Sequence, residues 1–172
     1  RGRRRARVLA ILGDDTGLNF YSDRMAVQSL SQIAEVKFVG WQPGQNIAEL
    51  KAQICNAIAD EQGWDILFFA GHSNETAIAG GQLAIAPNTS MLISEIAPQL
   101  TQAKERGLQF AIFNSCSGLT IANSLINLGL SQVAIMREPI HNKVAQEFLV
   151  HFLQSLGEYK DVQESMLVAC QY

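Results

Sequence analysis

One short apolar run, followed by glycine and histidine, constrains the fold of this chain more than any other feature. The segment that begins at Trp64 (WDILFFA) is apolar at every position except Asp65, and the run stops at Gly71-His72. A strand with one exposed face alternates apolar and polar residues, whereas an unbroken run is typical of a strand buried on both faces of a parallel sheet. Parallel strands need long crossover connections, which are usually helices. The run therefore predicts an α/β protein whose sheet is covered by helices.

The rest of the chain alternates between short apolar runs and segments with helical periodicity. Further strands are predicted at 7–12, 36–41, 108–114 and 132–136, and helices at 20–34, 46–58, 90–106, 118–127 and 144–156. Asn46 and Ser90 are the candidate N-caps, and a hairpin is predicted within 76–87, around Gly80-Gly81. Such βαβ series place helices on both faces of the sheet. The predicted fold class is a three-layer α/β/α fold with a mainly parallel central sheet and a short hairpin after the third strand.

Length, composition and charge limit the classes of protein that fit. With 172 residues, of which 48% are hydrophobic, the chain can bury the core of one domain without disulfide or metal staples. No apolar run is long enough to span a bilayer, so no direct membrane insertion by this segment is predicted. The net charge of −3 gives no general reason to expect a nucleic-acid partner.

The first residues differ in charge from the rest of the chain. The block Arg1–Arg7 (RGRRRAR) is the only strongly basic stretch. Its terminal place predicts a solvated basic arm or linker remnant over residues 1–6, followed by a single domain over residues 7–172. The first residue is arginine, and no signal-peptide pattern follows it. We therefore expect this segment to be part of a longer protein.

The cysteines bear on compartment and on metal binding. Cys55, Cys116 and Cys170 are odd in number and widely spaced. This pattern favours reduced thiols in a cytoplasmic setting over a disulfide framework. Neither a CxxC nor an HExxH spacing occurs, so the sequence predicts no metal site and no cofactor.

Polar residues follow the predicted strands, at the carboxyl ends where parallel sheets bind their ligands. They are Asp14, Asp15, His72, Ser73, Asn114, Ser115, Cys116, Arg137 and Glu138. His72 and Cys116 follow consecutive apolar strands and lie 44 positions apart. If these strands are neighbours, both side chains come to one edge of the sheet. The sequence therefore predicts a His–Cys pair at this edge.

This pair has the elements of nucleophilic catalysis. A thiol with an ordinary pKa of about 8.5 is a weak nucleophile at neutral pH unless a base or a helix N-terminus favours the thiolate. His72 is the candidate base, and a helix beginning near Gly118 favours negative charge at its start. The backbone N–H groups of Ser73 and Cys116, expected in polar turns, are the candidate donors to a tetrahedral oxyanion. The alternative is that these segments are ordinary turns or helix caps.

Other classes fit the alternating pattern less well. An α/β-hydrolase with a cysteine elbow would use His141 or His151 as its base, but its motif requires glycine where this chain has Asn114. A phospho-receiver domain requires an aspartate after the third strand and a lysine after the fifth, where this chain has His72 and Arg137. No glycine-rich phosphate loop follows the first strand. The His–Cys arrangement remains the preferred interpretation.

The segments that carry this pair resemble those of a known family. FAGHS, LQFAIFNSCSGL and QVAIMREPIHNKVAQEFLVHFL are similar to the CHAT domains of bacterial proteins, and the resemblance covers roughly Arg7 to Ala169. CHAT domains belong to the caspase-like cysteine peptidases, with separase and the metacaspases as relatives. The resemblance implies a caspase-like fold and a regulated cysteine endopeptidase, in which a His72–Cys116 dyad cleaves peptide bonds through a thioester acyl-enzyme. A catalytically silent module for signalling or protein interaction is the alternative.

The resemblance also indicates where substrate side chains bind. Metacaspases carry an acidic residue two positions before the cysteine, which binds a basic substrate side chain, whereas this chain has the neutral Asn114. Asp14, Asp15 and Glu138 could supply charge to the pocket instead. Ser73 stands where many relatives have glycine after the histidine.

The resemblance further implies the partners of the domain. We expect a protein or peptide substrate, together with regulatory domains of the same longer protein, either helical repeats or a membrane-anchored sensor. The family fold has a sixth strand, and only MLVACQY (166–172) remains at the end of this chain to form it.

Overall fold

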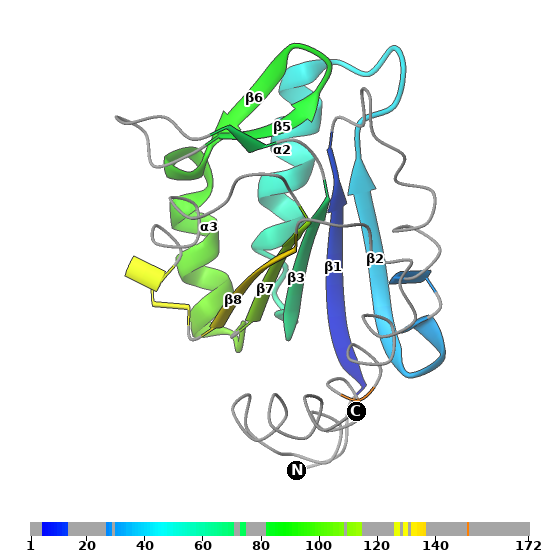
Figure 1. Ribbon diagram of the computed structural model, residues 1–172, viewed down its shortest axis with the longest axis vertical. Coiled ribbons are helices and arrows are strands. Elements are labelled where there is room, and N and C mark those ends of the chain that lie inside the picture. Colours follow the sequence, from blue (N-terminus) through cyan, green and yellow to red (C-terminus); the bar gives the residue numbers. More distant parts are fainter. Residues whose placement is uncertain are drawn as a thin grey trace.

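The described part of the chain is built around a parallel sheet. The computed structural model describes residues 5–13, 27–28, 30–70, 73–74, 82–108, 110–114, 126–127, 129–130, 132–136 and 151 of the 172-residue chain. Five parallel strands form a sheet in the order β2-β1-β3-β7-β8, and three antiparallel strands form a smaller sheet in the order β4-β5-β6 (Figure 1). The elements are β1 (Ala6–Leu12), η1 (Leu30–Gln32), β2 (Ala34–Gly40), α2 (Ile47–Ile58), β3 (Ile66–Ala70), β4 (Ser73–Asn74), β5 (Gln82–Ala86), β6 (Thr89–Leu92), α3 (Ile93–Glu105), β7 (Phe110–Asn114) and β8 (Gln132–Met136).

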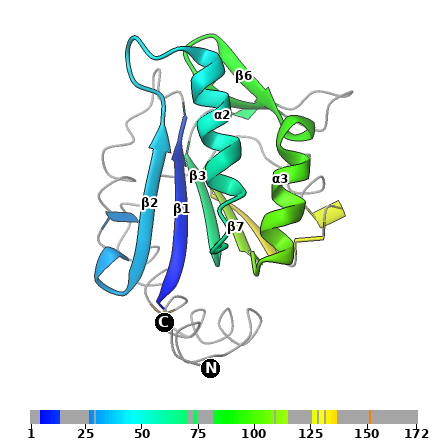
Figure 2. The same cartoon turned by 180° about the vertical axis from the view of Figure 1, so that it is seen from behind.

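Layers of side chains and helices cover both faces of the parallel sheet. Helices α2 and α3 lie side by side on one face, as the view from behind shows (Figure 2). The opposite face packs against Val27 and against Leu30 of η1. The predicted α/β fold, with a mainly parallel sheet and a hairpin after its third strand, is confirmed.

The two central strands are buried on both faces, as the unbroken apolar run predicts. Every residue of β1 and β3 is buried. Leu9, Ile11, Leu67 and Phe69 belong to the core under α2 and α3, while Val8, Ala10, Ile66 and Phe68 belong to the core on the opposite face. Full burial of a large aliphatic or aromatic side chain contributes about 2 kcal/mol. Both strands are therefore fixed from two sides.

The N-cap and the buried face of helix α2 follow the pattern in its sequence. Asn46 is its N-cap, and the side-chain Oδ1 accepts hydrogen bonds from the backbone N–H groups of Ala48 at 2.8 Å and Glu49 at 3.3 Å. Leu50, Ile54 and Ile58 are buried against the sheet at the predicted helical spacing. Both the cap and the apolar face are confirmed.

The segment between β3 and α3 differs from the prediction. A hairpin is present, but its two longer strands are β5 and β6, which turn at Pro87-Asn88. Asn88 has a φ of 57°, in the left-handed region that asparagine tolerates better than most residues. Strand β4 also pairs antiparallel with β5, while Gly80-Gly81 lie outside the described residues. The local pattern missed this turn because β6 (TSML) continues directly into the helical segment.

The start of α3 is corrected accordingly. Ser90 lies in β6, so it is not the N-cap. The helix begins at Ile93, and the N–H of Leu92 donates to Oε2 of Glu95 at 2.8 Å. Because Leu92 has no polar side chain, the carboxylate three residues later supplies the cap. At the other end, the predicted stop at Gly107 is confirmed by its φ of 115°.

Other boundaries differ in smaller ways. The predicted helix 20–34 overlaps the start of β2, because Ala34 is already paired with Ala6 in the parallel ladder. Residues 27–28 are helical, and residues 14–26 lie outside the described part. Strand β8 has the predicted bounds, and Gly129, with a φ of 100°, ends a helical segment as predicted. Of the predicted helix 144–156, only the helical His151 is described.

Arg7 belongs to the strand predicted at 7–12, but it is not solvated as expected for the basic block Arg1–Arg7. The residue lies in β1 and is 9% exposed. Its Nε donates to Oε2 of Glu35 at 2.6 Å, its Nη1 donates to the carbonyl of Gly63 at 2.6 Å, and the guanidinium lies 4.2 Å from the ring centre of Trp64. These partners are distant in sequence, so the local charge pattern does not reveal them. Residues 1–4 lie outside the described part.

Among the described residues, no helix combines the length and the hydrophobicity that crossing a membrane requires.

Candidate functional site

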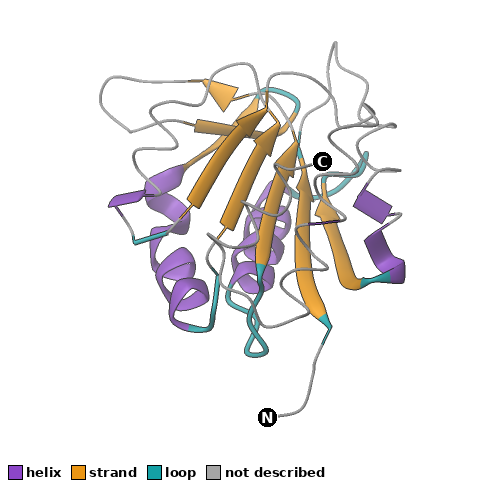
Figure 3. Ribbon diagram, turned by 60° about the horizontal axis from the view of Figure 1, so that its bottom comes forward, coloured by secondary structure: helices purple, strands orange, loops and turns teal. Residues whose placement is uncertain are grey.

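The parallel strands all point toward one edge of the sheet (Figure 3), and their last residues are register partners. Leu12 pairs with Gly40 and with Ala70. Asn114, in turn, pairs with Ala70 and with Met136. Each of the five strands thus ends at the same level of the ladder. Asn114 is itself the end of β7, and every other predicted site residue follows one of these ends in the sequence.

The pairing of β3 with β7 is the central observation at this edge. Ala70 and Asn114 are register partners on adjacent parallel strands, which lie about 4.8 Å apart. His72 follows Ala70 by two residues, and Cys116 follows Asn114 by two residues. Two residues span at most about 7 Å, so both chain segments are short enough for the two side chains to meet. The predicted neighbourhood of the two strands is confirmed.

Several predicted site residues lie outside the described part of the chain. They are Asp14, Asp15, His72, Cys116, Arg137, Glu138, His141 and Cys170. Four of them follow strands that end at this edge. His72 follows Ala70, Cys116 follows Asn114, and Arg137 and Glu138 follow Met136. The dyad and the charged pocket residues therefore stay predictions.

Ser73 is described, and its place differs from the prediction. It is the first residue of β4 and pairs with Leu83 of β5, whereas the sequence suggested a polar turn. In an antiparallel ladder, alternate residues direct their N–H groups away from the partner strand. Membership of β4 therefore does not by itself occupy the N–H of Ser73, and its role as an oxyanion donor stays a prediction. Asn114 lies at the end of β7, as expected.

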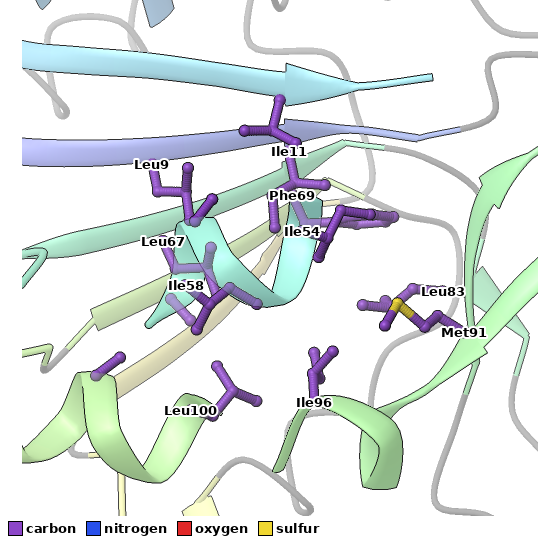
Figure 4. Packing of buried hydrophobic residues seen from close by; sticks show 14 of the residues in the cluster. Leu9, Ile11, Ile54, Ile58, Leu67, Phe69, Leu83, Met91, Ile96 and Leu100 are labelled. Carbon is purple, nitrogen blue, oxygen red and sulfur yellow. The ribbon is translucent and has the colours of Figure 1, made fainter. Parts of the chain in front are cut away.

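The small antiparallel sheet packs closely against the same edge. The N–H of Gly13, just after β1, donates to the carbonyl of Ala70 at 2.8 Å. A Cβ atom built on Gly13 would lie 2.1 Å from the carbonyl oxygen of Ala84 in β5. Leu83 and Met91 extend from the hairpin toward Phe69 and belong to the same core cluster (Figure 4). The sequence indicated only a turn at Gly13, because the glycine belongs to the cluster Gly13-Asp14-Asp15-Thr16-Gly17.

Cys55 is the free cysteine that the described residues contain. It lies on α2, is half-buried and packs against the core. Burial raises the pKa of its thiol, and the Glu95 carboxylate raises that pKa further, against the opposing charge of Lys51. A thiol with a raised pKa forms less thiolate at neutral pH. Cys55 is thus a poor candidate nucleophile and a useful internal standard for Cys116.

Within the described ranges, His, Cys, Asp and Glu side chains form no group of three or more that could hold a metal ion.

Comparison with known proteins agrees with the fold and with the strand-end motifs. The family model of the CHAT domain matches residues 5–170, which is nearly the whole chain. Among curated proteins, none matches the sequence. The family match includes both FAGHS and NSCSG, the segments that follow β3 and β7. The chain therefore belongs to the CHAT domain family, within the caspase-like superfamily.

Proposed function

We propose that this domain is a regulated cysteine endopeptidase, with Cys116 as nucleophile and His72 as general base. The observation that carries the proposal is the register of β3 and β7, in which Ala70 and Asn114 are paired. His72 and Cys116 follow these partners at the same offset of two residues. Membership of the caspase-like superfamily supports the same chemistry.

In the proposed reaction, His72 first accepts the proton of the Cys116 thiol. The sulfur then bonds to the carbon of the scissile carbonyl, and backbone N–H groups of Ser73 and Cys116 donate to the resulting oxyanion. When the C–N bond breaks, His72 returns the proton to the leaving amine, and a thioester remains. Water then attacks the thioester while His72 accepts its proton. The C–S bond breaks, the acid product leaves, and the thiol is restored by that proton.

Substrate recognition in this proposal is by protein or peptide side chains at the same edge. Asn114, which ends β7, offers a neutral amide that forms hydrogen bonds but no ion pair. Asp14, Asp15 and Glu138 follow β1 and β8 in the sequence and supply the negative charge for a basic substrate side chain. Regulation comes from other domains of the same longer protein.

Cleavage of a peptide library and of a cell proteome tests the activity. The wild-type domain is expected to generate new peptide N-termini, and both Cys116→Ala and His72→Ala are expected to abolish them. Cys55→Ser is the matched control, because it removes a half-buried thiol from α2 and leaves the edge of the sheet unchanged. Its cleavage pattern should equal that of the wild type.

Alkylation by iodoacetamide provides a readout that needs no substrate. At pH 7, Cys116 is expected to react at least about tenfold faster than Cys55, because a paired histidine favours the thiolate and Cys55 has a raised pKa. His72→Ala should remove most of this difference. If Cys116 is no more reactive than Cys55, and His72→Ala leaves its rate unchanged, the domain is a catalytically silent interaction module.

A further inference from the structure

Gly13 contacts both the end of β3, which precedes His72 in the sequence, and β5, which pairs with the strand β4 that follows His72. On one side, its N–H donates to the carbonyl of Ala70, the last residue of β3, at 2.8 Å. On the other side, its Cα faces the backbone of Ala84 in β5 so closely that a Cβ would lie 2.1 Å from the Ala84 oxygen. Strand β5 is the partner of β4, which begins at Ser73, directly after His72.

The packing at Gly13 leaves no room for a side chain. A separation of 2.1 Å is far below van der Waals contact, and the atom opposite is a backbone oxygen that no change of rotamer can move. The added Cβ would also lie 3.1 Å from Cζ of Phe69, which is itself buried in the core. Any residue other than glycine must therefore displace β5 away from the end of β1.

The hairpin is held in this place from its other side as well. Leu83 and Met91 are 5% and 3% exposed and pack in the core with Phe69 (Figure 4). The ladder between β5 and β6 shifts register between Ala84 and Ala86, and such bulges bend a strand locally. Ala84 is thus the point at which β5 approaches Gly13. Because β5 carries β4 with it, a displacement at Ala84 changes the position of Ser73 relative to Ala70.

We infer that Gly13 is a positioning residue for the His72–Cys116 pair. By lacking a side chain, it lets β5 pack against the ends of β1 and β3, which fixes both segments that flank His72 in the sequence. This inference rests on the proposed function, since it concerns the base of that dyad. It adds that the distance between His72 and Cys116 depends on Gly13, which lies on neither β3 nor β7 and contacts Ala70, two residues before His72.

Gly13→Ala is the direct test, and Gly63→Ala is its matched control. At Gly63, a Cβ would lie 2.5 Å from the carbonyl oxygen of Arg106, and the positive φ of 75° adds backbone strain. The Gly63→Ala substitution thus produces the same kind of clash with a backbone oxygen, but Gly63 precedes β3 and lies at the opposite end of the sheet. Both variants should lower the melting temperature, whereas only Gly13→Ala should change the environment of His72.

The first readout is hydrogen exchange of backbone amides, which is independent of any catalytic role. Gly13→Ala should speed exchange at Ser73–Asn74 and in β5, and Gly63→Ala should leave these amides as in the wild type. Unchanged exchange at Ser73–Asn74 in Gly13→Ala would overturn the inference whether or not the domain is a peptidase.

The second readout is the rate of Cys116 alkylation as a function of pH. In Gly13→Ala, the rate at pH 7 should fall about tenfold, and the midpoint should move toward that of an unassisted thiol near 8.5. Gly63→Ala should retain the wild-type profile. If His72→Ala shifts the pH profile of Cys116 alkylation but Gly13→Ala does not, the positioning role of Gly13 is wrong and the proposed dyad is retained. If His72→Ala itself has no effect, the dyad fails, and the positioning role fails with it.

Met91→Ala covers the case in which Gly13→Ala does not fold. This truncation loosens the hairpin from the core side and substitutes no residue of β1 or β3. It should shift the alkylation profile in the same direction as expected for Gly13→Ala, by a smaller factor of about three. If Met91→Ala folds and has the wild-type profile, the hairpin does not position His72 and the inference is wrong.

Discussion

The two ends of the parallel sheet are held together by different physical means. At the end where the strands begin, the guanidinium of Arg7 is buried, and charge and hydrogen bonds join distant segments around it. Its partners are the carboxylates of Glu35 and Asp60, the carbonyl of Gly63 and the ring of Trp64. Trp64 is 1% exposed, and its Nε1 donates to the carbonyl of Ala57 at 2.7 Å.

At the end where the strands finish, the described segments are joined by close backbone packing. Gly13, Ala70 and Ala84 bring three chain segments together with small side chains or none. Behind them, Leu83 and Met91 bury the hairpin in the core. If Gly13 positions the dyad as we infer, the contacts that fix the beginnings of the strands are separate from those that position the candidate site. Changes at the first end should lower stability alone, whereas changes at the second should alter both stability and thiol reactivity.

The largest expected effect concerns Leu83, which is 5% exposed and pairs with Ser73. Leu83→Ala removes buried methyl groups and should lower the free energy of unfolding by about 3 kcal/mol. It should also slow Cys116 alkylation at pH 7. Ile58→Ala is the control, because Ile58 is 1% exposed in the same core cluster (Figure 4) but follows Ala57, whose carbonyl accepts the hydrogen bond from Trp64. Urea unfolding should show a similar loss of stability in Ile58→Ala, and its Cys116 alkylation rate should be that of the wild type. Equally slow alkylation in both variants would contradict the proposed difference between the two ends of the sheet.

Arg7→Met should have the next largest effect. It keeps most of the apolar stem but leaves the Gly63 carbonyl and the Asp60 carboxylate without this donor, at a cost of about 2 kcal/mol. Lys51→Met is the control, because the Lys51–Glu95 pair is exposed on both sides and should contribute less than about 0.5 kcal/mol. Urea unfolding compares the two. Cys116 alkylation should be normal in Arg7→Met, and a shifted pH profile there would mean that the two ends are not independent.

Glu95→Gln should have a moderate effect at the junction of β6 and α3. The substitution replaces a charged acceptor for the Leu92 N–H with a neutral one, and it also removes the ion pair with Lys51. The expected loss is about 1 kcal/mol in the free energy of unfolding. Since Leu92 ends the hairpin, exchange of the β6 amides should become faster than in Lys51→Met, which loses the ion pair alone. Equal exchange rates in the two variants would show that the cap does not hold the hairpin.

The smallest expected effect is the dependence of stability on pH. The backbone N–H of Gln62 lowers the pKa of Asp60, and Arg7 lowers it further. The backbone N–H of Leu92 lowers the pKa of Glu95, assisted by Lys51. Because both pKa values are lower in the folded chain, these groups stabilise it above their unfolded pKa values near 4 and lose this contribution as the pH falls through the folded values.

Urea midpoints at pH 6 and pH 3 measure this contribution, which should be below about 1 kcal/mol for each group after screening by solvent. Asp60→Asn should reduce the difference between the two midpoints at the Arg7 end, and Glu95→Gln should do so at the hairpin end. A larger pH effect in Asp60→Asn than in the wild type would contradict the assignment.

The sequence alone predicted those parts of the fold that depend on neighbours in the chain. The unbroken run Ile66–Ala70 indicated a strand buried on both faces, and Asn46 and Gly107 marked helix ends, because burial pattern and capping are local properties. The CHAT resemblance, drawn from the strand-end motifs, is also confirmed. Arg7 lies in the strand predicted at 7–12, but its burial was missed because its partners lie 28 to 58 residues away, where no periodicity reaches.

The candidate site was predictable to the level of strand ends. Asn114 ends β7 and pairs with Ala70, as the expected order of strands requires. The turn at Pro87-Asn88 was missed, and with it the approach of Ala84 to Gly13, because that contact joins residues 71 positions apart. The dyad of His72 and Cys116 stays a prediction that the alkylation experiments test.

Strand β1 also sets a length scale for labelling the protein. Arg5, the first described residue, precedes Gly13 by eight residues, or about 26 Å along an extended strand. A donor fluorophore at residue 5 and an acceptor on a peptide bound at the carboxyl edge of the sheet would be separated by roughly this strand length. The efficiency of energy transfer between the two labels would therefore report binding of the peptide at that edge, without a substitution at any residue of the edge.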